Sequence, residues 1–216
     1  MCGYFGNVHE CPAVIELMHQ LNLPPAYKIS ERAYQRRRYS GLVTTNGYSE
    51  AMWWYALRTE EGKLVINEKL TSFNARDLSK PLWREPLKTK RALVLCSEIG
   101  ESNGKDKYLM RSEEGFALGC LYKDWVAPDG SRLRSFAVIT REPHDRFKKY
   151  HEKSTPFFLP LDKDILAEWL NPTIGNSELI NDLLATPRLY NDIKVTKVKS
   201  YKDAKPMSDV DILKKD

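Results

Sequence analysis

The first residues of the chain, Met1-Cys2-Gly3, could supply a nucleophile for aldehydes. Cysteine is small enough for the initiator methionine to be removed, which leaves Cys2 with a free α-amine beside its thiol. The amine of such a 1,2-aminothiol forms a Schiff base with an aldehyde, and the thiol then closes on the imine carbon as a thiazolidine. An α-amine has a pKa of roughly 7.7–8.0, so a useful fraction is neutral near pH 7, whereas a lysine at roughly 10.4 would need strong desolvation. Met-Cys alone is more often an ordinary terminus, so the rest of the chain must decide.

Three further segments carry the other groups that imine chemistry requires, an orienting hydrogen bonder and two acid–base groups. They are the amide of Asn74, the carboxylate of Glu101 and the imidazole of His151. Each also has a structural interpretation, as a turn or cap residue, a loop carboxylate and a surface histidine. Glu98 is a rival for the carboxylate role, and the sequence leaves that alternative open.

Composition limits the classes of protein to consider. The 216 residues are 42% hydrophobic with a net charge of +5, which supports a real core and is compatible with an anionic partner. We expect no transmembrane helix and no secretory signal, because no run of 18 apolar residues and no basic segment before an apolar one is present. The cysteines fit no zinc template, so we expect reduced thiols in the cytoplasm and no metal or cofactor. They are Cys2, Cys11, Cys96 and Cys120.

The elements that must position these groups are mostly strands. Hydrophobic periodicity and turn residues predict strands at 51–57, 63–66, 91–96, 108–110, 115–122, 135–140 and 193–198, with turns at 103–104 and 128–130. Helices are predicted at 12–23, 166–170 and 177–184. The pattern indicates one β-rich α+β domain over residues 1–200, followed by a charged tail at 201–216 that we expect to fray. The basic run Arg36-Arg37-Arg38 is either a solvated face or a nucleic-acid contact.

Taken in order, these segments resemble the SOS response-associated peptidase (SRAP) family, whose pattern opens with Met-Cys-Gly-Arg-Phe. The resemblance covers about residues 1–200. It rests on Met1-Cys2-Gly3, Met52-Trp53-Trp54, Asn74-Ala75-Arg76, Arg84-Glu85 with residues 88–93, and Ser-Phe-Ala-Val-Ile-Thr at 135–140. The departures are Tyr4 for the family's arginine, Glu98 to Ser102 for Gly-Phe-Tyr-Glu-Trp, Lys153 for arginine, and Ser154-Thr155 for methionine.

The resemblance implies a single SRAP-like domain, with a barrel-like antiparallel sheet core and a few flanking helices. It also implies a monomer in the cytoplasm, at the nucleoid or in a host cell if the chain is phage-encoded. In a DNA-damage (SOS) response it would bind single-stranded DNA and crosslink to abasic sites, with the Cys2 thiazolidine shielding the lesion. The implied catalytic residues are Cys2, Asn74, Glu101 and His151, and the implied DNA-binding residues are Trp54, Arg76, Arg84, Thr140 and Lys153.

Two other functions stay open at this point. Cys2 could act as the nucleophile of a cysteine peptidase that processes its own N-terminus. The chain could also be a non-catalytic module that binds single-stranded DNA. Trp54 is core by its apolar surroundings and a base-stacking residue by resemblance, a contact that contributes roughly 1–3 kcal/mol per base.

Overall fold

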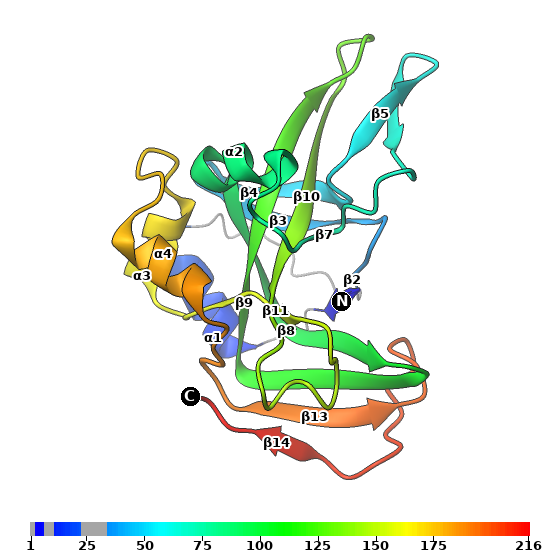
Figure 1. Cartoon of the computed structure of the whole chain (residues 1–216), viewed down its shortest axis with the longest axis vertical. Helices are drawn as coiled ribbons and strands as arrows, with labels where there is room; N and C mark the ends of the chain where they lie inside the picture. Colours follow the sequence, from blue (N-terminus) through cyan, green and yellow to red (C-terminus); the bar gives the residue numbers. More distant parts are fainter. Residues whose placement is uncertain (1–2, 7–10, 23–33) are drawn as a thin grey trace.

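A closed five-stranded β-barrel forms the centre of the computed structural model, which describes residues 3–6, 11–22 and 34–216. The barrel strands are β3 (Tyr39–Thr44), β4 (Gly47–Trp53), β8 (Arg91–Asn103), β9 (Asp106–Val126) and β10 (Arg132–Arg141). Their order is β9-β10-β4-β3-β8, and a further pairing between β8 and β9 closes the ring (Figure 1). This confirms the predicted barrel-like α+β domain, although β10 runs parallel to β4.

Shorter strands extend this sheet at its edges. β1 (Tyr4–Gly6) pairs with β8 and with β2 (Tyr34–Gln35), and β13 (Ile193–Val198) pairs with β9 and with β14 (Asp211–Leu213). Three two-residue strands, β7 (Asn74–Ala75), β11 (Thr155–Pro156) and β12 (Phe158–Leu159), join β10 or β9. A separate hairpin consists of β5 (Leu57–Glu60) and β6 (Lys63–Ile66).

Four helices lie in the described part of the chain. They are α1 (Pro12–Gln20), α2 (Pro81–Thr89), α3 (Lys163–Leu170) and α4 (Glu178–Ala185). Proline stands in the first turn of α1 and α2, where its missing N–H is not needed. Asp162 and Ser177 cap α3 and α4 by accepting backbone N–H bonds from the first turn. All four helices lie on one flank of the barrel (Figure 1).

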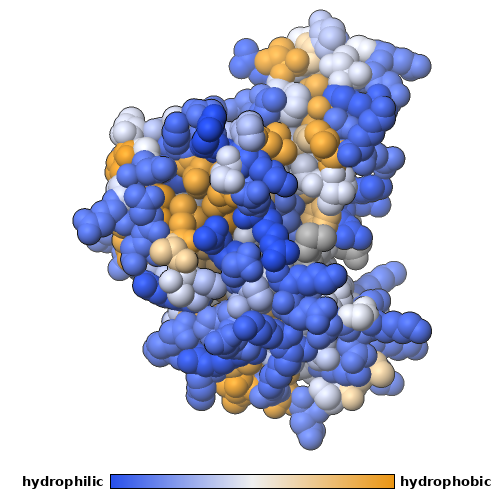
Figure 2. Space-filling model, viewed as in Figure 1, coloured by the Kyte–Doolittle hydropathy of each residue, from blue (hydrophilic) through white to orange (hydrophobic). Residues whose placement is uncertain are grey.

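The two faces of the barrel wall pack into two different cores. Side chains from the inner face, among them Phe5, Trp53 and Phe136, form one buried cluster. Side chains from the outer face pack against the helices, as Trp169 of α3 does. Hydrophilic side chains cover most of the surface in Figure 2, with an apolar area over the helical flank. Within the described residues, none of the helices is long and apolar enough to cross a membrane.

The structure differs from the sequence prediction in three elements. Residues 51–57 do not form one strand, because β4 ends at Trp53 and β5 begins at Leu57. Helix α2 was not predicted, since its internal Pro86 is typical of a helix break. The tail does not fray throughout: β14 pairs with β13, and the side chain of Leu213 is buried in the inner cluster.

A β-bulge in β8 determines which side chains of that strand reach the barrel interior. Cys96 and Ile99 both belong to the inner cluster. In a regular strand, two residues three positions apart would point to opposite faces. The register with β9 shifts between Cys96 and Glu98, and this bulge explains why Cys96 and Ile99 point to the same face. Beyond the bulge, Ile99 and Glu101 therefore share the inner face, and Glu98 lies on the outer one.

Candidate functional site

Glu101 and His151 form a buried pair of acid–base side chains. Glu101 lies near the end of β8 and is 1% exposed, and His151 follows a turn after β10 and is 8% exposed. The Nδ1 atom of His151 is 3.9 Å from Oε2 of Glu101 and 2.9 Å from the carbonyl oxygen of Ser102. Because a carbonyl only accepts, Nδ1 carries the proton, and the neutral ring keeps its lone pair on Nε2.

The environment pushes the pKa values of these two groups in opposite directions. Burial raises the pKa of the Glu101 carboxyl from its ordinary 4.5 to about 7. Burial also lowers the pKa of His151 below its ordinary 6.5, and the positive charges of Lys153 and Arg76 lower it further, against the bond to Ser102. Near pH 7 the site therefore holds a carboxyl that can donate a proton beside an imidazole that can accept one.

Glu98, the rival carboxylate, belongs to a different cluster on the outer face of β8. Its Oε2 accepts a bond of 2.9 Å from Nε of Arg111, and its Oε1 accepts one of 2.8 Å from the hydroxyl of Tyr4. Both carboxylate oxygens of Glu98 are therefore bonded to side chains on the outer face, away from His151. The geometry thus favours Glu101 as the acid–base carboxyl.

Strand β1 brings the start of the chain next to Glu101. Tyr4 pairs with Gly100 and Phe5 with Ile99 in the antiparallel ladder. The Phe5 ring packs on Trp53 with centroids 4.6 Å apart, which anchors the strand in the inner cluster. Cys2, the predicted nucleophile, lies outside the described residues.

Asn74 and Thr140 reach the same inner face from neighbouring strands. Asn74 of β7 pairs with Val138 of β10, so the two side chains share a side, and alternation puts Thr140 there too. The hydroxyl of Thr140 is fully buried and has no hydrogen-bond partner among the described residues. Asn74 therefore faces the interior of the barrel, and Thr140 lies beneath the surface rather than on it.

The predicted phosphate contacts separate into two places. Arg76 follows β7 and Lys153 follows His151; both are exposed, and both act on the pKa of His151. Arg76 makes only a weak surface pair with Glu142, at 3.7 Å. Arg84 lies on α2. This helix leads into the start of β8 at Arg91, which is ten positions along the strand from Glu101. The structure thus brings Arg76 and Lys153 to the site and leaves Arg84 away from it.

Trp54, the predicted base-stacking residue, is covered. Its side chain is 3% exposed, and its ring packs on Phe73 with centroids 5.6 Å apart. The guanidinium of Arg37 lies 4.9 Å above the Trp54 ring and also pairs with Glu68 at 2.9 Å. A base could stack on Trp54 only after Arg37 moved away, so the ring is core in this structure.

Contacts from the C-terminal residues were missed by the sequence reasoning. The hydroxyl of Tyr150, next to His151, donates to the carboxylate of Asp211, as does Lys149. The hydroxyl of Tyr201 donates a 2.6 Å bond to the carbonyl oxygen of Glu101. The alternation at 193–198 predicted the neighbouring strand β13, but nothing in the charged tail indicated these partners.

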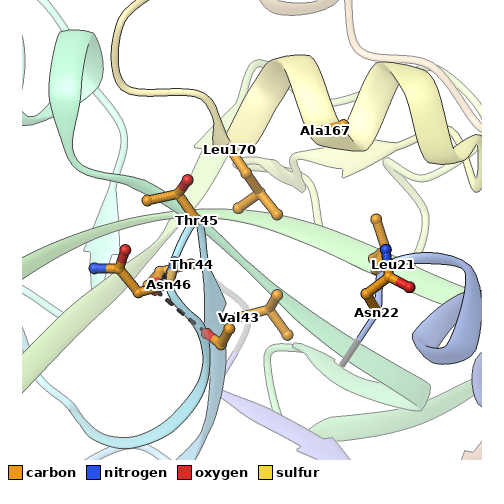
Figure 3. Close-up of a pocket in the computed structure, with 9 residues that line it drawn as sticks. Leu21, Asn22, Val43, Thr44, Thr45, Asn46, Ala167 and Leu170 are labelled. Carbon is orange, nitrogen blue, oxygen red and sulfur yellow. Dashed lines mark hydrogen bonds between the residues drawn. The ribbon is translucent and has the colours of Figure 1, made fainter. Parts of the chain in front are cut away.

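Two negative findings narrow the site. A cavity of about 500 Å³ lies between the end of α1, the β3–β4 turn and α3 (Figure 3), and the described residues that line it include no titratable side chain. Across residues 3–6, 11–22 and 34–216, no three His, Cys, Asp or Glu side chains come together as metal ligands would. Glu101 and His151 remain the candidate acid–base residues, with side chains 0% and 10% exposed, respectively.

The chain forms a closed barrel with helices on one flank, and a buried Glu–His pair lies beside its N-terminal strand. Comparison with protein-family models shows which class of protein has such a sequence. The family model described as SOS response associated peptidase (SRAP) matches residues 1–201. The chain belongs to the SRAP family.

Two curated relatives from Bacillus subtilis are similar to the chain in sequence. The chain is 28% identical to the abasic site processing protein YoqW of Bacillus subtilis over 55% of each chain. It is also 28% identical to YoaM of the same species, over 68% of this chain and 67% of YoaM. The match thus spans about half the length of YoqW.

The solved structures are more distant in sequence and show the fold alone. Crystal structures of proteins from Bordetella bronchiseptica and Bacteroides thetaiotaomicron superpose with TM-scores of 0.71 and 0.69. Both cover 92% of this chain, at 14% and 17% identity, and this chain covers 100% and 93% of theirs.

Proposed function

We propose that the protein captures abasic sites in single-stranded DNA by forming a thiazolidine with Cys2. The observation that carries the proposal is the Glu101–His151 pair, with its opposed pKa shifts, beside the strand that begins two residues after Cys2. Consecutive Cα atoms are about 3.8 Å apart, so the chain itself keeps Cys2 within about 7.6 Å of Tyr4. The Bacillus subtilis relatives named abasic site processing proteins support the choice of substrate.

The reaction needs proton transfers that the pair can supply. The neutral Cys2 amine attacks the aldehyde carbon of the ring-opened sugar and gives a carbinolamine. Glu101, whose pKa of about 7 leaves a substantial fraction protonated at neutral pH, donates a proton to the departing hydroxyl, which leaves as water, while the nitrogen passes a proton to His151. The thiol then adds to the imine carbon, and its proton moves to the nitrogen. One carbon–nitrogen and one carbon–sulfur bond form, and one water is lost.

Binding and orientation fall to the surrounding side chains. Arg76 and Lys153 attract the phosphates next to the lesion, and Asn74 orients the sugar or the terminal backbone without adding charge. Burial lowers the pKa of His151, and the charges of Lys153 and Arg76 lower it further, which preserves the imidazole lone pair for the reaction. No metal or cofactor takes part in this scheme.

The test uses purified protein and a single-stranded oligonucleotide with one abasic site, analysed on a denaturing gel and by intact mass. We expect a heat-stable adduct that lacks Met1 and is one water lighter than the sum of its parts. It should be absent in Cys2→Ala and present in Cys11→Ala, a matched control whose thiol donates to the carbonyl of Glu113 and packs against the outer cluster. Retention of Met1 would contradict the proposal, because a blocked amine cannot form the ring. No adduct from a free Cys2 would also contradict it and would favour a peptidase or a binding module.

A further inference from the structure

Tyr201 lies on the outer side of the strand that carries Glu101. Its hydroxyl donates a 2.6 Å hydrogen bond to the backbone carbonyl of Glu101 itself. The next carbonyl along the strand, that of Ser102, accepts the bond from Nδ1 of His151. The carbonyls of two consecutive residues, Glu101 and Ser102, therefore accept hydrogen bonds from Tyr201 and from His151, respectively.

The Tyr201 ring also contacts the N-terminal strand. It stacks on the ring of Tyr4, with centroids 4.7 Å apart and planes inclined by 28°. Tyr4 in turn donates to Glu98, which Arg111 holds. The two rings thus connect the strand that follows Cys2 with the strand that carries Glu101.

Gly100 allows this close approach. A Cβ atom at position 100 would come within 2.7 Å of the Tyr201 ring and 2.9 Å of the Tyr4 ring. Any larger residue at this position would push at least one ring away from the strand. The space above Gly100 is therefore filled by the two tyrosines.

We propose that Tyr201 is a positioning residue that sets the geometry of the Glu101–His151 pair relative to the N-terminal strand. The inference deepens the proposed function and rests on it. Tyr201 touches neither DNA nor the reacting atoms in this scheme; it acts through the carbonyl of Glu101 and through Tyr4. Without its hydroxyl, the 101–102 segment gains freedom, water reaches the carboxyl more easily, and the pair is correctly placed for a smaller fraction of the time.

Tyr201→Phe tests this, because it deletes the hydroxyl and keeps the stacked ring. We expect the rate of adduct formation at saturating DNA to fall about 10-fold, while the affinity for an oligonucleotide with an unreactive tetrahydrofuran lesion stays the same. Tyr122→Phe is the matched control, because this tyrosine is also buried and packs under Lys90 and Arg134. It lies near the end of β9, whereas Glu101 pairs with Tyr108 near the start of that strand. Gly100→Ala should reproduce the rate loss with every tyrosine intact.

A second measurement does not depend on crosslinking. In protein labelled with ¹³C at the glutamate carboxyls, we expect the pKa of Glu101 to be lower in Tyr201→Phe than in the wild type. A shifted pKa in a protein that forms no adduct would support the positioning role and contradict the proposed function. Unchanged rate and unchanged pKa in a variant made from an active wild type would overturn the positioning role alone. A lower melting temperature with both quantities unchanged would also overturn it, because that is a purely structural effect.

Discussion

Glu98 and Glu101 lie three positions apart on β8, and their carboxylates face opposite sides of the strand. Glu98 binds Arg111 and Tyr4 outside, and Glu101 lies 3.9 Å from His151 inside. Alternation along the strand puts the two carboxylates on opposite sides, and the bulge between Cys96 and Glu98 determines that Glu101 is the one facing inward. A regular strand would have turned Glu98 inward with Cys96, because side chains alternate.

The two carboxylates offer a matched pair of substitutions. Glu101→Gln removes the proton donor and should slow adduct formation on the order of 10²-fold, the low end of what general acid–base catalysis contributes. Glu98→Gln breaks an outer cluster and should leave the rate within a few-fold of the wild type. Quenched time courses on denaturing gels measure both. Equal losses in the two variants would show that the carboxyl role is not specific to Glu101.

The raised pKa of Glu101 also predicts how stability depends on pH. The folded carboxyl has a pKa of about 7 against an ordinary 4.5, so the folded state binds more protons than the unfolded state between these values. The wild type should therefore lose stability as the pH rises from 4.5 to above 7, and Glu101→Gln should not. At pH 8 the variant should be more stable by as much as about 3 kcal/mol. Urea unfolding at several pH values checks this, and parallel curves for both proteins would contradict it.

Charge removal at the site should alter DNA binding and the imidazole together. Arg76→Ala and Lys153→Ala should each weaken binding of single-stranded DNA and reduce the slope of log K against log salt by about 0.7 per lost phosphate contact. Each should also raise the pKa of His151, because both cations lower it. Salt titrations and NMR titration of the imidazole provide the readouts.

Arg84→Ala serves as the control for these variants. Arg84 lies on α2, at the far end of β8, and should change neither quantity. A loss of affinity in Arg84→Ala as large as in Arg76→Ala would place the DNA path over α2 instead.

Trp54 should behave as a core residue in mutagenesis. Trp54→Ala removes a buried ring that packs on Phe73 and lies under Arg37, so the free energy of unfolding should fall by about 3–5 kcal/mol. Arg37→Ala uncovers the ring without emptying the core and should change stability by much less. Stronger DNA binding by Arg37→Ala would show that a base stacks on the Trp54 ring once Arg37 no longer covers it. Unchanged stability in Trp54→Ala would contradict the assignment of Trp54 to the core.

Much of the fold follows from local patterns in the sequence. The apolar runs at 91–96 and 135–140 correspond to buried strands. The turn predicted at Asn103-Gly104 lies one residue later, because Asn103 pairs with Asp106 and the loop between β8 and β9 is Gly104-Lys105, with Gly104 at a φ of 60°. Helix α2 escaped prediction because Pro86 contradicts its local propensity. Strand β14 escaped because it has only three residues, Asp211–Leu213, within a charged tail, and its pairing with the distant β13 makes it a strand.

The candidate site was predictable in its residue types but not in its geometry. Asn74, Glu101 and His151 are recognisable as chemistry-bearing residues, and the structure puts Glu101 and His151 together. The choice between Glu98 and Glu101 depends on a one-residue register shift, which no periodicity reveals. The role of Tyr201 depends on a contact across 100 positions. Such contacts come from barrel closure rather than from any local signal.

The pairing of β1 with β8 has a kinetic consequence. Tyr4 and Glu98 are 94 positions apart, so the N-terminal strand cannot dock until more than 90 residues have been synthesised and β8 has formed. Pairings of such long range form slowly, because the loop must close before the contacts stabilise it. Under the proposed function, a nascent chain would therefore carry the aminothiol of Cys2 without the acid–base pair beside it. Cys2 of an unfinished chain would then react only slowly with the small aldehydes of metabolism. The faster, catalysed reaction would begin once the barrel has closed and Glu101 and His151 lie beside the N-terminal strand.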